Sequence, residues 1–282
     1  FRAASLLHFY GVTPVYSHRD SVRIAFLLAA LNDVPILATD IGNAYLNANP
    51  REKVYTTAGP EFGSELQGKS VLIVRALYGL KSSDAAWRAH LANTLHQLLG
   101  YTSCLADPDV WFRPTRKTDN FEYYEYVLVY VDDLLVISHQ GEKTMKALEE
   151  YYRLKDGFAP PMRYLGAEVK QWQFPQDITK TKWAQSSTQY VKEAVKNIES
   201  LLKTQDRKLY SANQPMHTDY SPELDITPFL DDEMVNFYQS QINILRWMVE
   251  LGRLDIYIQV ALLSSYLVQP RQGHLEAVYY IY

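Results

Sequence analysis

Two adjacent carboxylates, Asp132 and Asp133, lie between two apolar runs of the sequence. The runs 126–129 and 134–137 have the residue types of buried strands, so the acidic pair predicts a β-hairpin whose turn carries both carboxylates. Aspartate is common in turns for conformational reasons, and a solvated turn is therefore the alternative interpretation. A third carboxylate close to the pair would favour a chemical role.

Asp40 is a candidate for that third carboxylate, because it follows the apolar stretch 34–39. If the two segments are neighbouring strands, three carboxylates converge, and they cannot all stay ionised without a cation. Mg²⁺ is the expected ion, since it binds a few carboxylates and takes its other ligands from water and substrate phosphates. Two such ions would support an in-line phosphoryl transfer.

Eight blocks of residues follow one another along nearly the whole chain: 13–15 with 21–23, 40–47, 54–55, 76–81 with Trp87, 106–108, 130–133, 164–166, and 253–256 with Pro270 and His274. In this order they resemble the reverse transcriptase domain of copia-type (Pseudoviridae) LTR retrotransposon polyproteins. Together the blocks are far more specific than any one of them. The resemblance implies an α+β fold of the right-hand polymerase type, with fingers, palm and thumb, an antiparallel palm sheet backed by helices, and a helical connection segment.

The resemblance also implies RNA- and DNA-templated DNA synthesis with two Mg²⁺ ions, for which Mn²⁺ could substitute. The catalytic residues would be Asp40, Asp132 and Asp133, and the metal site would consist of Asp40, Ile41, Asp132 and Asp133. The site for the incoming deoxynucleoside triphosphate would consist of Arg23, Gly42, Asn43, Ala44 and Tyr45. Template and primer would contact Tyr78, Lys81, Arg88, Tyr130, Tyr164, Leu165, Gly166, Lys192 and Lys196.

Several of these residues have a plain structural alternative. Tyr45 would be the steric gate that excludes a ribose 2′-hydroxyl, or else a core tyrosine. Arg23 would lie beside the nucleotide, or else be a solvated cation of a first helical turn. Lys81 and Arg88 could contact phosphates, although most exposed cations are simply solvated. After Lys81 the segment 82–85 departs from the family, which has a Gln there and then Pro-Arg or Gly-Arg, so the Arg expected to hold the template is absent.

Apolar periodicity and local signals predict the remaining elements. Helices are expected over 21–32 with Asp20 or Ser21 as cap, 84–100 with Asp84 as cap, 143–155, 187–202 with Ser186 or Ser187 as cap, 231–252, 254–268, and after Gly273. Strands are expected at 71–74, 110–113 and 121–129, with a loop at 114–120, a hairpin at 162–172 and a linker at 204–230. Asp107 and Asp109 are expected to be turn formers. The expected parts are 1–175 for fingers and palm, 176–218 for the thumb, and 219–282 for a helical connection towards a ribonuclease H domain beyond the chain.

The composition is that of an ordinary globular protein of 282 residues, 47% of them hydrophobic. The single cysteine, Cys104, excludes an internal disulfide and a thiolate zinc cage, and it fits a reducing compartment. The net charge of −4 argues mildly against nucleic-acid binding, yet 28 Lys and Arg suffice for a local basic groove. We expect no membrane-spanning stretch and no secretory signal, and the missing initiator methionine indicates a fragment.

The expected partners follow from the resemblance: a template–primer duplex, deoxynucleoside triphosphates, and other parts of a retrotransposon polyprotein such as ribonuclease H and integrase, but no membrane. The expected location is cytoplasmic, in a retrotransposon particle, or nuclear. Two alternatives stay open. One is a decayed or domesticated copy that binds nucleic acid or protein without turnover. The other is a different two-metal palm enzyme such as a nucleotide cyclase, which the long C-terminal helical region disfavours.

Overall fold

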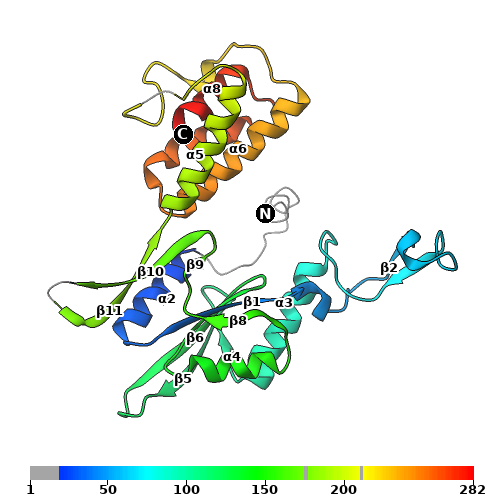
Figure 1. Cartoon of the computed structure of the whole chain (residues 1–282), viewed down its shortest axis with the longest axis vertical. Coiled ribbons are helices and arrows are strands. Elements are labelled where there is room, and N and C mark those ends of the chain that lie inside the picture. The colour runs from blue at the N-terminus through cyan, green and yellow to red at the C-terminus, as the bar shows by residue number, and fades with distance from the viewer. Residues whose placement is uncertain (1–18, 175–176, 210–211) are drawn as a thin grey trace. The chain divides into compact units, whose positions relative to one another are not determined.

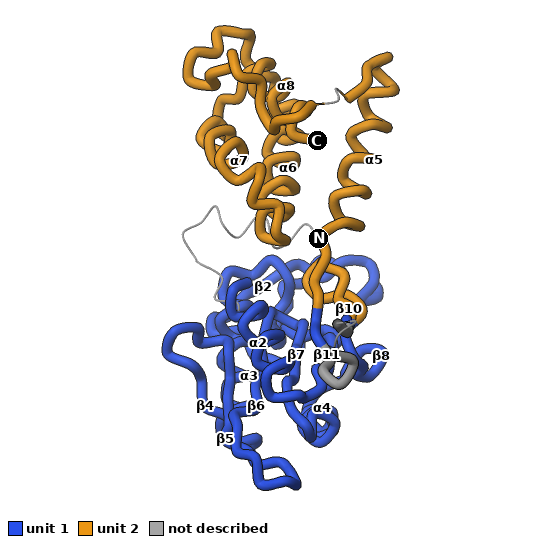
Figure 2. The backbone as a smooth tube through the Cα atoms, turned by 90° about the vertical axis from the view of Figure 1, so that its left-hand side faces the viewer, with its two compact units in different colours: residues 1–161, 171–183 blue, residues 162–170, 184–282 orange. Residues whose placement is uncertain are grey.

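The computed structural model describes residues 19–174, 177–209 and 212–282 (Figure 1). The block at 13–15 that contributes to the resemblance lies outside these residues. The chain is a mixed α+β protein with antiparallel sheets, and it divides into two compact units (Figure 2). The first consists of residues 1–161 with 171–183, and the second of residues 162–170 with 184–282. The assignment of segments to fingers, palm, thumb and connection stays a prediction.

A six-stranded antiparallel sheet is the centre of the first unit, with the strand order β4-β5-β6-β7-β1-β8. Its strands are β1 (Ile36–Ile41), β4 (Thr102–Ser103), β5 (Val110–Arg116), β6 (Glu122–Tyr130), β7 (Asp133–Ile137) and β8 (Leu154–Ala159). In β7, the residues 134–136 are fully buried. A strand that is covered on both faces has a continuous apolar run, which is the pattern that the sequence shows here.

Helices cover this sheet. The helices of the first unit are α2 (Arg19–Leu31), α3 (Ser83–Asn93), which a π-helical turn (Thr94–Leu98) extends, and α4 (Gly141–Glu149). Trp87 and Leu91 of α3 and Met145 of α4 join one apolar cluster with residues of β6 and β7. Figure 1 shows α2 and α4 on opposite sides of the sheet. The apolar residues whose periodicity predicted these helices therefore form their buried faces.

Two predicted helix caps are wrong. α2 begins at Arg19, and the Ser21 hydroxyl donates a hydrogen bond to Asp107 Oδ2 at 2.5 Å. Asp84 lies inside the first turn of α3, where its carboxylate accepts a hydrogen bond from the Tyr45 hydroxyl. In both cases the polar side chain has a partner that is distant in sequence, which a local capping pattern cannot anticipate.

Two predicted boundaries near the sheet are also wrong. Pro114, expected in a loop, lies in β5 opposite Tyr124. The strand tolerates a residue without an N–H there, because β4 pairs with β5 only as far as Phe112. The helix expected over 143–155 ends at Glu149, because residues 154–159 form β8 beside β1.

Two smaller sheets accompany the large one. One is the hairpin of β2 (Val54–Thr57) and β3 (Ser70–Ile73), and the other has the order β11-β10-β9, with strands β9 (Arg163–Tyr164), β10 (Ala167–Phe174) and β11 (Asp177–Ser186). The predicted hairpin near residue 165 is confirmed by the pairing of β9 with β10. Its turn has φ angles of 47° at Leu165 and 85° at Gly166, and a Cβ at Gly166 would lie 3.1 Å from the Trp247 indole nitrogen. Glycine is therefore required at position 166.

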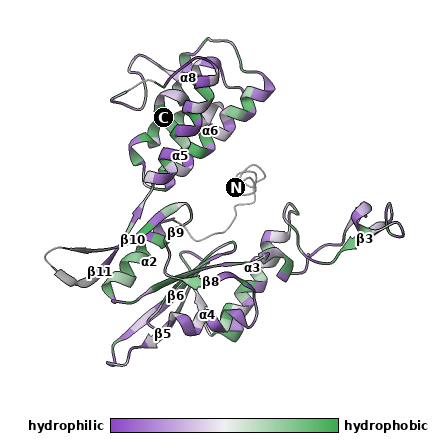
Figure 3. Cartoon of the chain, in the orientation of Figure 1, coloured by the Kyte–Doolittle hydropathy of each residue, from purple (hydrophilic) through white to green (hydrophobic). Residues whose placement is uncertain are grey.

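The helices of the second unit are α5 (Thr188–Thr204), α6 (Asp232–Glu250), α7 (Tyr257–Leu263) and α8 (Gln272–Ile281). All four contribute to one apolar core, and each carries both apolar and polar residues (Figure 3). The predicted start of α6 is confirmed, because Asp231 accepts a hydrogen bond from the Met234 N–H at 2.8 Å. The helix expected over 254–268 consists of α7 between two 3-10 turns. No helix among the described residues is long and apolar enough to cross a membrane.

Candidate active site

The turn between β6 and β7 carries the first of the acidic pair. Tyr130 is opposite Asp133 in the register of the two strands, so the turn consists of Val131 and Asp132. The expectation that both carboxylates lie in the turn is therefore wrong for Asp133, which is the first residue of β7. The strand pairing fixes the position of Asp133 more firmly than a turn would.

This turn is strained and is held by two hydrogen bonds. Val131 has a φ of 58°, a left-handed conformation that β-branched residues rarely adopt. The Trp87 indole N–H donates to the Val131 carbonyl at 2.7 Å, and the Ile41 N–H donates to the Asp132 carbonyl at 2.8 Å. Such strain persists only where the surrounding structure over-determines it, and it is concentrated at functional sites.

Asp40 lies in β1 directly opposite Asp133. The prediction that Asp40 and the acidic pair lie on neighbouring strands is confirmed. On its other side, Asp40 is opposite Lys155 of β8, and the Lys155 ammonium is 3.8 Å from Asp40 Oδ2. Sequence reasoning missed Lys155, because residues 143–155 were assigned to one helix.

Burial and mutual repulsion make the acidic pair hard to ionise. Burial raises the pKa of Asp133 from its ordinary value of 3.8 to about 7, and the charges of Asp132 and Asp40 add to this effect. Burial, together with the charge of Asp40, also raises the pKa of Asp132. Carboxylates in this condition gain from a bound cation, and an all-oxygen donor set suits Mg²⁺.

The fit to a metal ion concerns donor chemistry rather than a preformed cage. Across residues 19–174, 177–209 and 212–282, no three His, Cys, Asp or Glu side chains are grouped so that they could hold a metal ion as they stand. The backbone register nevertheless brings Asp40 and Asp133 opposite each other and places Asp132 next to them. Rotation of the three side chains would change which carboxylate oxygens face one another without any change in this register.

The segment after β1 places Tyr45 under a second tyrosine. Tyr45 is 5% exposed, its hydroxyl donates to Asp84 Oδ1, and its ring packs edge-on against Tyr78 with the centroids 4.4 Å apart. Tyr78 is 58% exposed, and its hydroxyl donates to Asp132 Oδ2 over a long 3.4 Å. Burial and the charge of Asp132 raise the pKa of Tyr78 to about 12, so its hydroxyl stays protonated. The burial of Tyr45 agrees with the core-tyrosine alternative, and its role as a gate stays a prediction.

The other residues of the expected nucleotide site have distinct surroundings. The Gly42 N–H donates to the Arg153 carbonyl at 2.9 Å, and Asn43, with a φ of 54°, precedes the 3-10 turn Ala44–Asn47. The Ile41 and Ala44 side chains are fully buried, so only their backbone atoms could reach a ligand. Arg23 is half-exposed and pairs with Asp20 at 2.8 Å on the same helix.

Arg88 differs from Lys81, with which it was paired as a phosphate contact. The Arg88 Nε lies 2.8 Å from Asp109 Oδ1, and the Asp109 side chain is only 3% exposed. The expectation that Asp107 and Asp109 are turn formers is therefore incomplete, because both are buried and bonded to helices. Lys81 is exposed. Arg88 therefore has a structural role, and a phosphate that bound it would have to compete with the Asp109 carboxylate.

The remaining template candidates fall in different parts of the fold. Tyr130 ends β6, with the Arg19 guanidinium 5.9 Å from its ring centroid. Tyr164 is buried in β9, beside the turn of Leu165 and Gly166, and Lys192 and Lys196 are exposed on α5. These last five residues belong to the second unit, and their action on a shared duplex stays a prediction.

Trp87 and Asp84 are further functional candidates, although the sequence assigns Trp87 no role of its own and Asp84 only that of a helix cap. Trp87 was noted only as part of a family block, and the Val131 carbonyl gives it a specific task. Asp84 occupies the segment that departs from the family, and this departure is the signal that could have drawn attention to it. Both act through backbone or side-chain partners that only the fold reveals.

Comparison with known proteins gives the family. A family model described as reverse transcriptase (RNA-dependent DNA polymerase) matches residues 1–200. A transposon Ty5-1 protein of Saccharomyces cerevisiae is 30% identical over 244 residues, which are 84% of this chain and 72% of that protein. The retrovirus-related Pol polyprotein from transposon TNT 1-94 of Nicotiana tabacum is 26% identical over 93% of this chain and 19% of its own length.

The Pol polyprotein from transposon RE1 of Arabidopsis thaliana is 25% identical over 92% of this chain. The chain spans 16% of that polyprotein, and so corresponds to a small part of such relatives. The matches nevertheless cover most of the chain, including the segments that carry Asp40, Asp132 and Asp133. The chain therefore belongs to the reverse transcriptase (RNA-dependent DNA polymerase) family, and its relatives are Ty5 and copia-type retrotransposon Pol polyproteins.

Proposed function

We propose that this chain extends a DNA primer on an RNA or DNA template, with the six-stranded sheet as the palm of a right-hand polymerase. The observation that carries the proposal is the placement of Asp40, Asp132 and Asp133 at one end of β1, β6 and β7. Membership of the reverse transcriptase family supports it. The strained turn, held by two hydrogen bonds, is the kind of pre-organised support that such chemistry requires.

Asp40 and Asp132 would hold two Mg²⁺ ions, with the Ile41 backbone beside them and Asp133 as an electrostatic support. Bound, these ions would lower the pKa of the primer 3′-hydroxyl and neutralise charge on the triphosphate. The contribution of the chain itself is to position the reacting groups and to fix the charge pattern. Lys155, paired with Asp40, keeps part of that charge balanced when the carboxylates ionise.

The nucleotide would lie over the segment 42–45, with Arg23 near its phosphates. Template and primer would contact the residues of both units assigned above, of which Arg88 is the weakest candidate because of its ion pair with Asp109. Further partners would be the other parts of a retrotransposon polyprotein. A cytoplasmic particle, or the nucleus, is where such a protein would act.

A second candidate function is that of a copy that binds nucleic acid or protein without turnover. One observation favours it. The segment 82–85 lacks the expected Arg, and its Asp84 instead bonds to Tyr45. This departure lies next to the site rather than in it, so we favour the polymerase.

Primer extension by the whole chain tests the proposal. We expect incorporation of deoxynucleotides that depends on Mg²⁺ or Mn²⁺, and no detectable incorporation by Asp132→Asn, which removes one metal-ligand charge. Asp219→Asn is the matched control, because it also removes one acidic charge, from a side chain that is 89% exposed. Duplex binding by both variants should match the parent. Binding without incorporation by the parent would support the non-catalytic copy instead.

A further inference from the structure

The ion pair between Arg88 and Asp109 joins α3 to the sheet at the end that carries the acidic turn. The Arg88 Nε donates to Asp109 Oδ1 at 2.8 Å, and the Asp109 side chain is 3% exposed. The Asp109 backbone carbonyl accepts a hydrogen bond from the Val129 N–H at 3.0 Å. Asp109 is therefore bonded both to α3 and to β6, close to the turn residue Val131.

Trp87, the residue before Arg88, closes this chain of contacts. Its indole N–H donates to the Val131 carbonyl at 2.7 Å. Successive side chains of an α-helix point about 100° apart, so the bonds of Trp87 and Arg88 hold α3 in two different directions and fix its rotation about its own axis. The contacts leave β6 at Val129 and return to the chain at Val131, so they enclose the strand end on which the turn depends.

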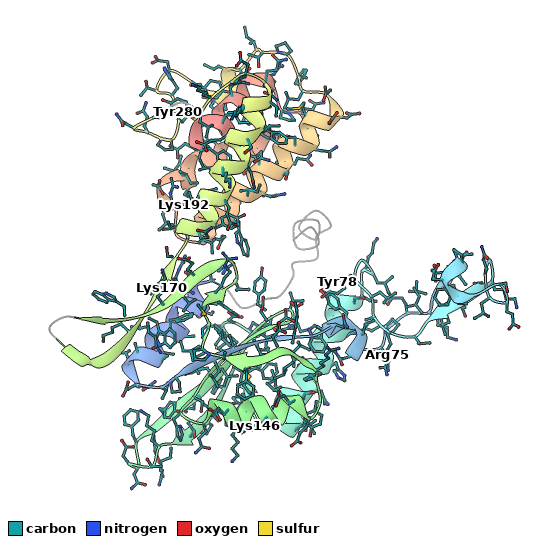
Figure 4. The ribbon with its side chains drawn as sticks, viewed as in Figure 1. Arg75, Tyr78, Lys146, Lys170, Lys192 and Tyr280 are labelled. Carbon is teal, nitrogen blue, oxygen red and sulfur yellow. The ribbon has the colours of Figure 1, made fainter. Side chains whose placement is uncertain are left out.

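The segment that leads into α3 gives the helix a second link to the acidic pair. Tyr78 lies beside the start of α3 (Figure 4), and its hydroxyl donates to Asp132 Oδ2 at 3.4 Å. A change in the position of α3 would therefore act on Asp132 in two ways, through the Val131 carbonyl and through this hydroxyl.

Stability alone gives little reason for the ion pair of Arg88 with Asp109. Apolar residues of similar volume often replace a buried ion pair without loss of stability, because the two charges no longer have to give up their hydration. The ion pair supplies direction instead, since an N–H of fixed orientation meets one carboxylate oxygen. A buried, directional bond next to the Trp87 donor is suited to setting the position of the helix.

We propose that Arg88 and Asp109 are positioning residues of the active site. They hold α3 in the rotation that lets Trp87 support the Val131 carbonyl, and they thereby keep Asp132 in place. The inference rests on the proposed function, because it concerns the turn that carries Asp132. It gives Arg88 a task that requires its pairing with Asp109 rather than with a phosphate.

The competing interpretation is that the ion pair only stabilises the fold. Trp87 is 2% exposed, and its ring packs edge-on against Tyr152 with the centroids 5.4 Å apart, so this packing would hold the indole without Arg88. In that case kcat follows the stability of each variant. Under the proposal, kcat falls even in a variant whose stability is intact.

Two variants of the whole chain separate these interpretations. Arg88→Ala leaves the Asp109 charge buried and unpaired with Arg88, so it should lower both stability and kcat. The double variant Arg88→Met/Asp109→Leu replaces the pair with apolar side chains and should unfold near the temperature of the parent. Its kcat in primer extension should nevertheless fall by at least about tenfold, because the turn is displaced. KM for the deoxynucleotide should stay close to that of the parent, since ground-state binding is not removed.

The Trp87 indole N–H gives a measurement that does not depend on activity. The chain has five tryptophans, and the indole resonance that is missing from Trp87→Phe identifies Trp87 in a proton–nitrogen NMR spectrum. In the double variant the loss of the bond to Val131 should move this resonance upfield. Its proton should also exchange faster with water.

Arg113→Ala is the matched control for Arg88→Ala. The Arg113 guanidinium lies 2.6 Å from Glu125 Oε1, and the two side chains are 36% and 3% exposed, against 40% and 3% for Arg88 and Asp109. This pair joins β5 to β6. Its loss should lower stability, because it strands a buried carboxylate, but should change neither kcat nor the Trp87 resonance.

The outcomes keep the inference and the proposed function apart. Parental kcat, or an unshifted Trp87 resonance, in the double variant would overturn the inference and leave the proposed function intact. A parent that incorporates no nucleotide with any metal would overturn the proposed function. The Trp87 resonance would then still show whether the ion pair holds the turn.

Discussion

Two hairpins of the first unit are stabilised in opposite ways. In the β6–β7 hairpin, which carries Asp132, Leu128 and Leu134 are fully buried. In the β2–β3 hairpin, Tyr55 and Leu72 form a cross-strand pair, but their side chains are 62% and 44% exposed. The first hairpin is part of a core that is covered on both faces. The second forms a two-stranded sheet by itself, and isolated pairs of this kind are marginally stable.

The difference indicates that the two hairpins have different roles within one unit. Only a buried frame can keep Val131 at a φ of 58° and the Asp132 carbonyl on the Ile41 N–H, so the backbone that carries the carboxylates has a fixed geometry. A hairpin with little buried surface opens and bends at small cost, which suits a segment that adjusts to a ligand.

A matched pair of leucine truncations tests the contrast directly. Leu134→Ala should lower the free energy of unfolding by about 2–5 kcal/mol, because it leaves a cavity between packed layers. Leu72→Ala should lower it by less than about 1 kcal/mol, since its side chain is already half in water. Urea unfolding of both variants, compared at equal m-values, measures the two effects. Equal losses would mean that the exposed hairpin is as much a part of the core as the sheet.

The hydrogen bond from Trp87 to the turn should matter for both stability and chemistry. Trp87→Phe leaves the Val131 carbonyl without its donor, which should lower the free energy of unfolding by about 1–3 kcal/mol. Because the turn then relaxes, primer extension should fall by about tenfold to a hundredfold. Trp172→Phe, at a 49% exposed tryptophan, is the control and should change neither quantity. Full activity in Trp87→Phe would show that the turn holds its shape without this bond.

The buried charge of Asp133 predicts a pH effect without metal. Its pKa is about 7 in the folded chain and near 3.8 in the unfolded chain, so the folded state binds more protons between these values. Stability should therefore fall as the pH rises through this window. Asp133→Asn removes the penalty and should be more stable than the parent by at least about 1 kcal/mol at pH 8, and by much less near pH 4. A constant difference in stability between Asp133→Asn and the parent across the pH range would contradict the assignment.

The sequence was sufficient to predict the strands where the apolar pattern and the burial coincide. The runs beside Asp132 and the stretch before Asp40 have the residue types of strands covered on both faces, and the fold pairs them as expected. The register could not be predicted to the residue, so Asp133 was placed in the turn. A single slip of register changes which carboxylate a strand fixes, and only the pairing partner decides it.

The predictions from the sequence failed where a polar side chain has a partner that is distant in sequence. Asp84 and Ser21 have the residue types of helix caps, but Tyr45 and Asp107 bind them. Lys155 was hidden by a helical pattern that in the fold gives way to β8. Local propensity contains no information about such partners, because they meet only after the sheet has formed.

The last prediction concerns nucleic-acid binding by Lys81, which lies between the β2–β3 hairpin and α3 and should contribute little to stability. Duplex affinity should weaken steeply with salt despite the acidic net charge, because phosphate contacts release counterions. Lys81→Ala, at an exposed residue between that hairpin and α3, should flatten the slope of log affinity against log salt by about one unit, without loss of stability. Lys146→Ala on α4, which is 68% exposed and pairs with Glu142, should leave the slope unchanged. Arg88→Ala should instead lower stability, because it strands the buried Asp109. A parent slope near zero would contradict a basic binding surface, and equal slopes in Lys81→Ala and the parent would remove Lys81 from it.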